Sequence, residues 1–285
     1  MCDTCGCGDP GSYQIRKAGQ EKTPESDAIH LHSESHGHDH DHLHAHPHEH
    51  DHSHHHDSFS GNTESGKRII ALGKDILETN NLMAERNRGF FEAKKVFCIN
   101  MVSSPGSGKT TLLEKTLAVL KNQYPVYVIE GDQQSMLDAD RLAKLEIPVV
   151  QINTGSGCHL DAMMVNKALK SFDIAPESLL FIENVGNLVC PALFDLGETA
   201  RVLVMSVTEG EDKPMKYPAM FRSARLCIIN KTDLLPYVDF RVEIARKSAG
   251  IMNPALEFLE VSAKTEEGLE GWFKWIIHSI NANGN

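Results

Sequence analysis

Apolar residues gather in seven short runs along the last two thirds of the chain, and several of these runs have no polar break. Runs of this length, separated by helix-length stretches, are typical of buried strands in a mostly parallel sheet that helices cover on both faces. The pattern therefore predicts an α/β domain. The expected strands span residues 96–102, 125–131, 148–153, 178–184, 200–207, 225–230 and 255–263.

A helical periodicity precedes the first strand, between residues 65 and 95. It predicts one long amphipathic helix that docks on the domain behind it. The apolar positions that carry this spacing are Ile69, Leu72, Ile76, Met83 and Phe90. Ligands of parallel sheets bind beyond the carboxyl ends of the strands, so functional side chains are expected just after each run.

Composition divides the first 62 residues into two parts, a cysteine cluster at 1–10 and a polar, His-rich segment at 11–62. The chain has 16 histidines, and all but His159 and His278 lie between positions 30 and 56. A segment this polar buries too little apolar surface to offset the entropy lost on ordering. We therefore expect it to be disordered. Its imidazoles are expected to bind metal. Residues 65–285 then form a folded domain of about 220 residues.

Charge and hydropathy exclude several classes of protein. The formal net charge of -11 argues against a general affinity for nucleic acid, whose phosphates are held by clustered Lys and Arg. No apolar run is long enough to span a membrane, and the N-terminus lacks the basic and apolar regions of a secretory signal. We therefore expect a cytoplasmic protein that binds neither nucleic acid nor membranes.

Seven cysteines in such a chain are metal ligands, reactive thiols or core residues sooner than disulfides. Cys2, Cys5 and Cys7 lie together beside the α-amino group, and three thiolates with an amine suit planar Ni²⁺ or Cu²⁺ better than tetrahedral Zn²⁺. A small zinc knuckle or adventitious thiols are the alternatives. Cys98 and Cys227 lie inside strand-like runs and are expected to be core residues.

The first run leads directly into "SSPGSGKTT", which fits a phosphate-binding loop at a strand-to-helix junction. Lys109 would reach the β- and γ-phosphates, and the hydroxyl of Thr110 would bind Mg²⁺. Ser103 replaces the first glycine of the usual G-x-x-x-x-G-K-[ST] pattern. The residues expected around the phosphates are Gly106, Ser107, Gly108, Lys109, Thr110 and Thr111.

Later loops point to guanine as the base. In "NKTD", Asp233 can accept hydrogen bonds from the N1–H and the exocyclic amine of guanine, a donor pair that adenine lacks. Phosphate loop, "ENVG", "NKTD" and "SAK" follow one another as in GTPases. In that arrangement Asn230 would brace the phosphate loop, Lys231 would lie over the base, and Ala263 and Lys264 would close the pocket.

Two carboxylates complete the expected nucleotide site. Glu183 ends a strand where a carboxylate near Mg²⁺ is expected, although most GTPases have Asp there. Asp132 is the best candidate for a switch residue that reaches Mg²⁺ or the attacking water. The expected catalytic set is therefore Lys109, Thr110, Asp132 and Glu183. No arginine finger is recognisable from the pattern, so intrinsic hydrolysis is expected to be slow.

A second group of metal-ligating residue types lies near these motifs. Cys158 and His159 are adjacent at a probable strand-to-helix junction, and Cys190 follows Glu183 by seven residues. Three ligands from two loops at one sheet edge can converge on a metal, although adjacent Cys and His also occur by chance. Because Cys190 follows the loop that would sense the γ-phosphate, a metal bound there would be tied to the nucleotide state.

These motifs together resemble the HypB family of hydrogenase maturation GTPases. The resemblance rests on "CDTCGCG", "NLMAERNR", "SSPGSGKTT", "NTGSGCHLDA", "FIENVGNLVCPA" and "NKTDLLPY", and it covers residues 65–285 and the N-terminal cysteines. It implies a P-loop NTPase fold and a GTP-dependent homodimer. It also implies a high-affinity nickel site on Cys2, Cys5 and Cys7, and a weaker nickel or zinc site on Cys158, His159 and Cys190. In the family, the lysine equivalent to Lys213 lies near the partner subunit's nucleotide.

The function implied is a GTP-hydrolysing nickel metallochaperone that stores nickel and delivers it to the [NiFe] hydrogenase large-subunit precursor, together with a partner nickel chaperone. Its ligands would be GTP, Mg²⁺, Ni²⁺ and, at the second site, Zn²⁺. Two alternatives stay open. One is a maturation GTPase for another client, such as urease, and the other is a metal-buffering protein with a regulatory G domain.

Overall fold

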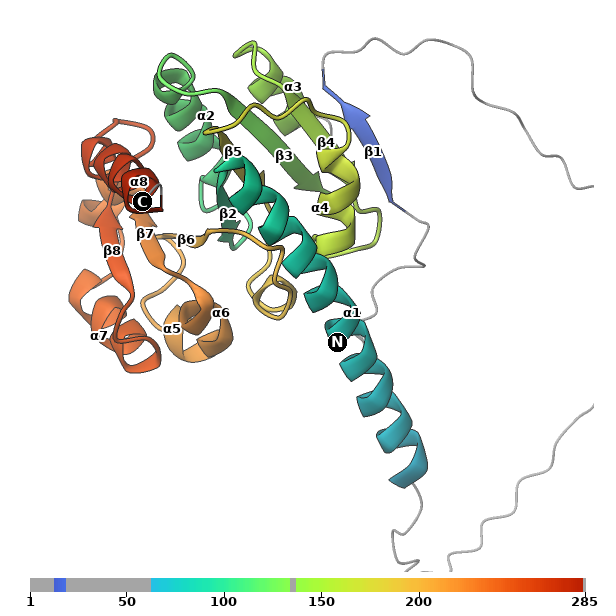
Figure 1. The fold of residues 1–285 in the computed structure, drawn as a ribbon. Coiled ribbons are helices and arrows are strands. Elements are labelled where there is room, and N and C mark those ends of the chain that lie inside the picture. Colours follow the sequence, from blue (N-terminus) through green and yellow to red (C-terminus); the bar gives the residue numbers. More distant parts are fainter. Residues whose placement is uncertain (1–12, 19–62, 134–136, 284–285) are drawn as a thin grey trace, which may run out of the picture.

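The computed structural model describes residues 13–18, 63–133 and 137–283 of the chain. Cys2, Cys5, Cys7 and the histidines between 30 and 56 lie outside the described residues. The described strands form one eight-stranded sheet in the order β1-β4-β3-β5-β2-β6-β7-β8, and each neighbouring pair is parallel except β1 and β4. Figure 1 shows this sheet with helices on both sides.

All seven strands expected from the apolar runs are present, so the α/β prediction is confirmed. They are β2 (Phe97–Ser103), β3 (Val126–Asp132), β4 (Val149–Asn153), β5 (Leu179–Glu183), β6 (Ala200–Ser206), β7 (Leu226–Asn230) and β8 (Glu257–Glu260). The connecting helices are α2 (Lys109–Leu120), α3 (Leu137–Ala143), α4 (Ala162–Leu169), α5 (Lys213–Lys216), α6 (Pro218–Ser223), α7 (Val242–Met252) and α8 (Leu269–Asn283). Two 3₁₀ turns, η1 (Cys190–Ala192) and η2 (Thr232–Tyr237), follow β5 and β7.

One strand was not expected. Residues Gln14–Lys17 of the segment predicted to be disordered form β1, which pairs antiparallel with the edge strand β4. Tyr13 and Ile15 pack against the core cluster beneath α1 and α4, and the Lys167 ammonium lies 4.9 Å from the centre of the Tyr13 ring. Four residues in polar surroundings give too short a pattern to predict a strand, so only the pairing partner reveals it.

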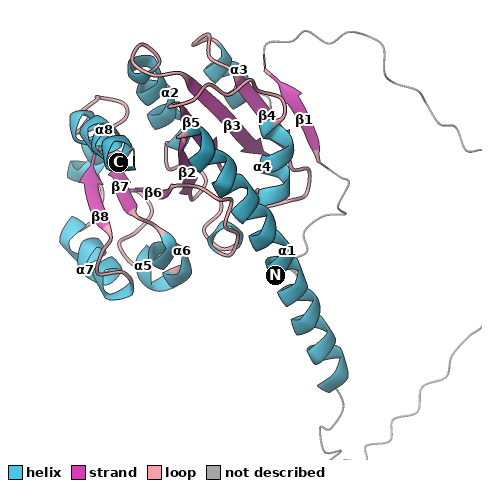
Figure 2. Cartoon of the chain, viewed as in Figure 1, coloured by secondary structure: helices cyan, strands magenta, loops and turns pink. Residues whose placement is uncertain are grey.

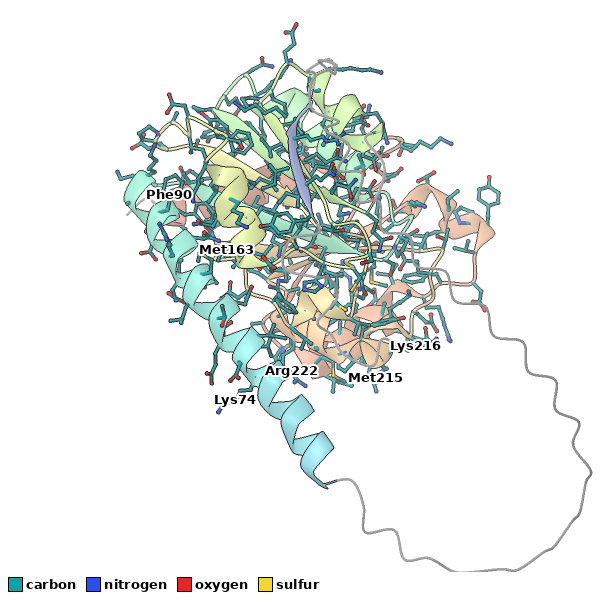
Figure 3. All side chains as sticks on the ribbon, turned by 90° about the vertical axis from the view of Figure 1, so that its right-hand side faces the viewer. Lys74, Phe90, Met163, Met215, Lys216 and Arg222 are labelled. Atoms are coloured by element: carbon teal, nitrogen blue, oxygen red, sulfur yellow. The ribbon has the colours of Figure 1, made fainter. Side chains whose placement is uncertain are left out.

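The predicted long helix is present as α1 (Thr63–Lys94), but its buried face differs from the expected one. Asn80, Ala84, Asn87 and Phe91 are the buried positions, whereas the apolar Met83 and Phe90 are only half-buried. The C-terminal half of α1 crosses the sheet beside α4, while its N-terminal half extends away from the body of the molecule (Figure 1). Figure 3 shows Lys74 in the extending part and Phe90 where the helix meets the body.

Alternating side chains of the strands contribute to cores on the two faces of the sheet, one cluster on one face and two on the other. Ile99 and Met101 of β2 face the core under α2, α3 and α8, while Cys98 and Val102 face the side that carries α1, α4, α6 and α7. Figure 2 shows helices on both faces of the strands. Cys98 and Cys227 are fully buried core residues, and burial raises the pKa of both thiols well above the ordinary value. Among the described residues, no helix is long and apolar enough to cross a membrane.

Candidate nucleotide and metal sites

The loop between β2 and α2 folds as a phosphate-binding loop. Gly106 and Gly108 have φ values of 73° and 90°, in the left-handed region that a side chain disfavours. A Cβ at Gly108 would also lie 2.5 Å from the amide nitrogen of Asn230. These constraints let the loop wrap closely under the N-terminus of α2, where free backbone N–H groups can face an anion. Ser103, in place of the usual first glycine, is buried at the end of β2.

Three oxygen-bearing side chains meet beside this loop. The Thr110 hydroxyl donates to Glu183 Oε1 at 2.6 Å and lies 3.3 Å from Asp138 Oδ2. The Lys109 ammonium lies 3.3 Å from the same Glu183 oxygen. A hydroxyl and two carboxylates are hard oxygen donors, which Mg²⁺ prefers. Glu183 Oε2 has no hydrogen-bond partner among the described residues, so the site retains a buried oxygen that a hydrated Mg²⁺ fits.

The sequence pattern predicts Asp132 as the switch residue and does not mark Asp138. Asp138 is held in place by Arg141, whose Nη1 donates to Asp138 Oδ1 at 3.0 Å. Arg141 in turn makes a two-point contact with the carboxylate of Glu114, at 3.1 and 2.6 Å. Asp132 ends β3, where its carboxylate accepts a hydrogen bond from the backbone N–H of Gln133. No local motif marks Asp138, because its role depends on α3 folding back beside α2.

Glu130 adds an unexpected buried carboxyl to this edge of the sheet. It is the register partner of Glu183 in the β3–β5 pair and is only 2% exposed. Burial, together with the charges of Glu183 and Asp132, raises the pKa of Glu130 to about 9. Glu130 is therefore protonated at neutral pH while no cation is bound. Its Oε2 and the hydroxyl of Ser107 also lack partners among the described side chains.

The base-binding motifs come together at the other end of the loop. Asn230 donates to the Ser107 carbonyl at 2.8 Å and accepts from the Ala263 N–H at 3.0 Å, so one side chain joins two motifs. The Lys231 ammonium lies 2.7 Å from the Gly106 carbonyl. Asp233 accepts a hydrogen bond from the Ser262 hydroxyl at 2.6 Å. The sequence pattern does not predict this contact.

The remaining members of the expected pocket lie at its margin. Thr111 is half-buried in the first turn of α2, and Lys264 is exposed in the turn after β8. The structure therefore brings together the phosphate-loop residues and the guanine motif, which the sequence spreads over more than 150 positions.

Cys158, His159 and Cys190 also converge. Their ligand atoms all lie within 4.8 Å of one another, and the two sulfur atoms are 3.0 Å apart. His159 is 7% exposed and its ring lies against that of Phe194, with centroids 4.0 Å apart. Burial lowers the pKa of His159, which keeps the imidazole neutral and able to bind a metal. Two thiols and a neutral imidazole suit Zn²⁺ or Ni²⁺.

Comparisons with known proteins point to one family. A family described as "CobW/HypB/UreG, nucleotide-binding domain" matches residues 97–260. The hydrogenase maturation factor HypB of Escherichia coli (strain K12) is 45% identical over 287 residues, which cover 97% of this chain and 98% of that protein. The chain belongs to the HypB family.

Two solved structures resemble this HypB-family chain. The crystal structure of HypB from Archaeoglobus fulgidus has a TM-score of 0.67 at 39% identity and covers 71% of this chain and 99% of its own. The crystal structure of HypB from Helicobacter pylori in complex with nickel has a TM-score of 0.68 at 36% identity and covers 72% and 96%. The fold is accordingly that of a P-loop NTPase, and the protein is a GTPase.

Asn184 connects the two sites of this HypB-family protein. Its carbonyl accepts from the Lys109 ammonium at 2.6 Å, and its side-chain oxygen accepts from the N–H of Leu160, the residue after His159, at 3.2 Å. Gly186, two residues further on, lies against the phosphate loop, since a Cβ there would be 3.1 Å from the Cα of Pro105. The loop after β5 therefore contacts the phosphate loop directly and leads to Cys190.

Lys213 lies on the phosphate loop of its own chain. Its ammonium is 3.1 Å from the Ser104 hydroxyl and 5.1 Å from the centre of the Tyr217 ring. The family resemblance predicts that this lysine lies near the partner subunit's nucleotide. In the single chain described here, it lies next to the phosphate-binding loop of its own subunit.

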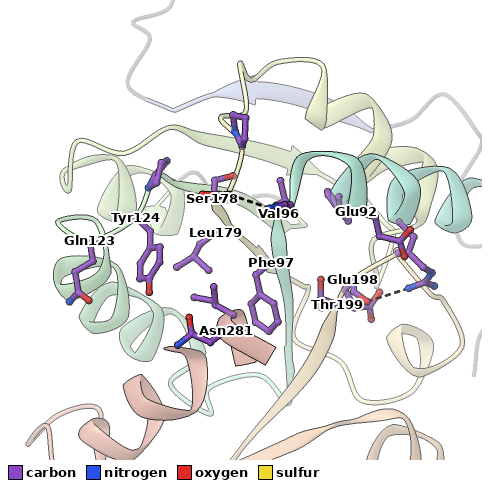
Figure 4. A pocket seen from close by; sticks show the side chains of 18 residues that line it. Glu92, Val96, Phe97, Gln123, Tyr124, Ser178, Leu179, Glu198, Thr199 and Asn281 are labelled. Atoms are coloured by element: carbon purple, nitrogen blue, oxygen red, sulfur yellow. Dashed lines mark hydrogen bonds and ion pairs between the residues drawn. The ribbon is translucent and has the colours of Figure 1, made fainter. Parts of the chain in front are cut away.

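One groove among the described residues lies away from the nucleotide site. It has a volume of about 1040 Å³ and opens at the amino ends of the strands, opposite the phosphate loop. Figure 4 shows Phe97, Tyr124, Leu179 and Glu198 along it. Glu198, which lines the groove, forms an ion pair of 2.7 Å with Arg201.

Proposed function

We propose that this GTPase is a nickel metallochaperone that binds nickel at Cys158, His159 and Cys190 and controls that nickel through its nucleotide state. The observation that carries the proposal is the contact of Asn184 with both Lys109 and Leu160, because one residue then touches the phosphate site and the metal loop. The nickel complex of the Helicobacter pylori relative supports nickel as the cargo. Delivery goes to the [NiFe] hydrogenase large-subunit precursor with a partner nickel chaperone.

Hydrolysis is assigned to the residues around the phosphate loop. Lys109 leaves its contacts with Asn184 and Glu183 to bind the β- and γ-phosphates. Thr110, Glu183 and Asp138 hold Mg²⁺, which neutralises charge that develops on the transferring phosphoryl group. Asp132 stays in this proposal as the residue that orients the attacking water. Asp233 accepts hydrogen bonds from guanine, with Ser262 holding its carboxylate in place.

A change at the γ-phosphate reaches the metal through the loop after β5. When Lys109 moves to the phosphates, the carbonyl of Asn184 loses this contact, and a shift of the Asn184 backbone moves the side chain that contacts Leu160. Metal–ligand bonds tolerate deviations of only about 0.2 Å, so a small displacement of Cys190 relative to His159 changes nickel affinity. By linkage, nickel must then change the preference for GTP over GDP by the same factor.

The test is a nickel titration in the two nucleotide states. The full-length protein carries Cys2→Ser, Cys5→Ser and Cys7→Ser, so that thiolate-to-nickel charge-transfer absorption reports Cys158 and Cys190. We expect affinities with GDP and with a non-hydrolysable GTP analogue to differ about tenfold, equal to about 1.4 kcal/mol. Asn184→Ala should reduce that ratio. Equal affinities in the two states of the wild-type site would contradict nucleotide control.

The N-terminal residues have separate roles in this proposal. Cys2, Cys5 and Cys7 carry nickel with high affinity, and the histidines between 30 and 56 store several further ions through neutral imidazoles. Deletion of residues 30–56 should lower the nickel capacity measured by equilibrium dialysis and leave GTP turnover unchanged. Capacity should also fall as pH drops below about 6.5, where free imidazoles become protonated. An unchanged capacity after the deletion would refute storage.

We further propose a GTP-dependent homodimer. Leu234, Leu235 and Val238 pack against their own core, but Tyr237 remains 83% exposed directly after the base-binding motif. Val189, Leu193 and Met215 are also exposed apolar residues, and the first two flank Cys190. Apolar side chains grouped beside functional loops are typical of contact surfaces. Sedimentation with and without a GTP analogue decides, and a monomer in both conditions would contradict the dimer.

A further inference from the structure

The proposed nickel ligands come from two loops that are about 30 positions apart in the sequence, and Asn184 and Asn187 of the second loop each form one hydrogen bond to the first. Cys158 and His159 lie shortly before Ala162, the first residue of α4, and Cys190 lies shortly before Asp195. A metal that binds all three side chains needs these loops at a defined separation. The described contacts show that helix α1, which supplies no ligand, holds both loops at once.

Asn80 of α1 joins the two loops with a single side chain. Its Oδ1 accepts a hydrogen bond from the Ala162 N–H at 2.9 Å, and its Nδ2 donates to the Asp195 carbonyl at 2.8 Å. Asn80 is only 6% exposed, so both bonds are shielded from water. A carboxamide is suited to this position because it carries a donor and an acceptor on one planar group.

Asn87, two helical turns later, repeats the same connection. Its Nδ2 donates to the Ala162 carbonyl at 2.9 Å and to the Leu196 carbonyl at 3.0 Å. Its Oδ1 accepts from Asn166 of α4 at 2.9 Å. Asn87 is fully buried, and its hydrogen-bonding groups have protein partners. Two buried asparagines on one helix face therefore bond to the same pair of loops.

The loop that contains Cys190 and Asp195 makes a close backbone approach to α1 at Gly197. Gly197 has a φ of 85°, and a Cβ there would lie 2.4 Å from the Ala84 carbonyl oxygen. Arg88 forms an ion pair of 2.6 Å with Asp195. Phe194, the residue before Asp195, is the one whose ring lies against His159. Helix α1 therefore holds Asp195, and the adjacent Phe194 contacts the imidazole of His159.

We propose that Asn80 and Asn87 are positioning residues for the metal site at Cys158, His159 and Cys190. The inference rests on the metal role given to those three residues under the proposed function. It accounts for the buried polar face of α1, where an amphipathic helix would normally present apolar side chains. Groups that orient metal ligands without touching the metal typically change its affinity by about 10- to 100-fold when altered.

The test measures nickel binding to the full-length protein with Cys2→Ser, Cys5→Ser and Cys7→Ser. The probe is Ni²⁺ buffered by a chelator, followed by thiolate-to-nickel charge-transfer absorption. Asn80→Asp keeps the shape and the acceptor but removes the Nδ2 donor to Asp195. We expect it to weaken nickel binding at least about tenfold and to shift the charge-transfer band, with GDP affinity unchanged. Asn80→Ser serves as the second variant if Asn80→Asp does not fold.

Two matched variants separate positioning from packing. Asn81→Asp alters the next residue, which is exposed, and should leave nickel affinity unchanged. Asn166→Ala removes the α4 hydrogen bond to Asn87 without removing either bond to the loop that contains Asp195. It should lower the melting temperature and leave nickel affinity within about twofold of the parent, well below the tenfold expected of Asn80→Asp.

Wild-type nickel affinity in both Asn80 variants would overturn the inference. A loss in Asn166→Ala as large as that in Asn80→Asp would also overturn it, because general packing would then explain the effect. Failure of the proposed metal role has a different signature. In that case Cys158→Ser would have the same charge-transfer spectrum as the parent protein, whatever the residue at position 80.

Discussion

The ammonium of Lys109 lies 2.6 Å from the main-chain carbonyl of Asn184, so the lysine proposed to bind phosphate is held by the loop that leads to Cys190. Its second partner is the Glu183 carboxylate at 3.3 Å. Both contacts lie where the γ-phosphate would compete for the same charge. In the proposed function, Lys109 gives up both contacts when it binds the phosphates, so the loop after β5 responds to the nucleotide.

Lys109→Ala should abolish GTP turnover while the fold is retained. Removal of one group that stabilises transition-state charge typically costs about 100-fold or more in rate. Lys121→Ala is the matched control, since Lys121 follows the same helix and its side chain donates to the Leu145 carbonyl at the protein surface. Phosphate release and circular dichroism provide the two measurements. Normal turnover in Lys109→Ala would remove this lysine from the catalytic site.

Asp233→Asn should weaken GTP binding by about 2 kcal/mol, because the buried pair of guanine donors loses its carboxylate partner. The variant should discriminate less against xanthosine nucleotides, whose base presents an acceptor at that position. Ser262→Ala, which removes only the 2.6 Å bond to Asp233, should have a smaller effect on the same equilibrium. Isothermal titration with GTP and XTP measures both. Unchanged base preference in Asp233→Asn would argue against the assigned role of this carboxylate.

Asp138→Asn should raise the Mg²⁺ concentration required for half-maximal turnover by about tenfold, since the site loses one anionic oxygen near Thr110. Arg141→Ala should act in the same direction by releasing Asp138. The GDP release rate, followed at increasing Mg²⁺, gives a readout independent of hydrolysis. Asp75→Asn on the exposed surface of α1 is the control. Identical Mg²⁺ curves for Asp138→Asn and wild type would exclude Asp138 from the cation site.

Glu130→Gln should stabilise the nucleotide-free protein, and more so at higher pH. The pKa of Glu130 is about 9 in the folded state against an ordinary value of 4.5, so the folded protein holds the extra proton between these limits. Stability is then lost as pH rises through this window, by at most about 1.4 kcal/mol per pH unit. Glutamine removes that loss. Melting temperatures at pH 5.5 and pH 8.5 test this, and a difference that does not grow with pH would contradict it.

Local sequence was sufficient for the strands, the phosphate loop and the guanine motif. Strands β2 to β7 are buried along almost their whole length, so continuous apolar runs mark them whichever strand lies beside each one. Gly106 and Gly108 mark the loop because their left-handed φ values are a local requirement of the backbone. The order of the motifs then placed Asn230 and Ala263 in one pocket, because parallel strands end at one edge.

Tertiary structure alone decided the contacts that join distant residues. Asp138 reaches Thr110 across 28 positions because α3 folds back on α2, and no spacing in the sequence encodes that distance. Helical periodicity predicted α1 but assigned its face to apolar residues, since an asparagine is ordinarily exposed. Asn80 is buried because Ala162 and Asp195, 82 and 115 positions away, satisfy its amide. The cost of burying a polar group depends on partners that only the folded chain supplies.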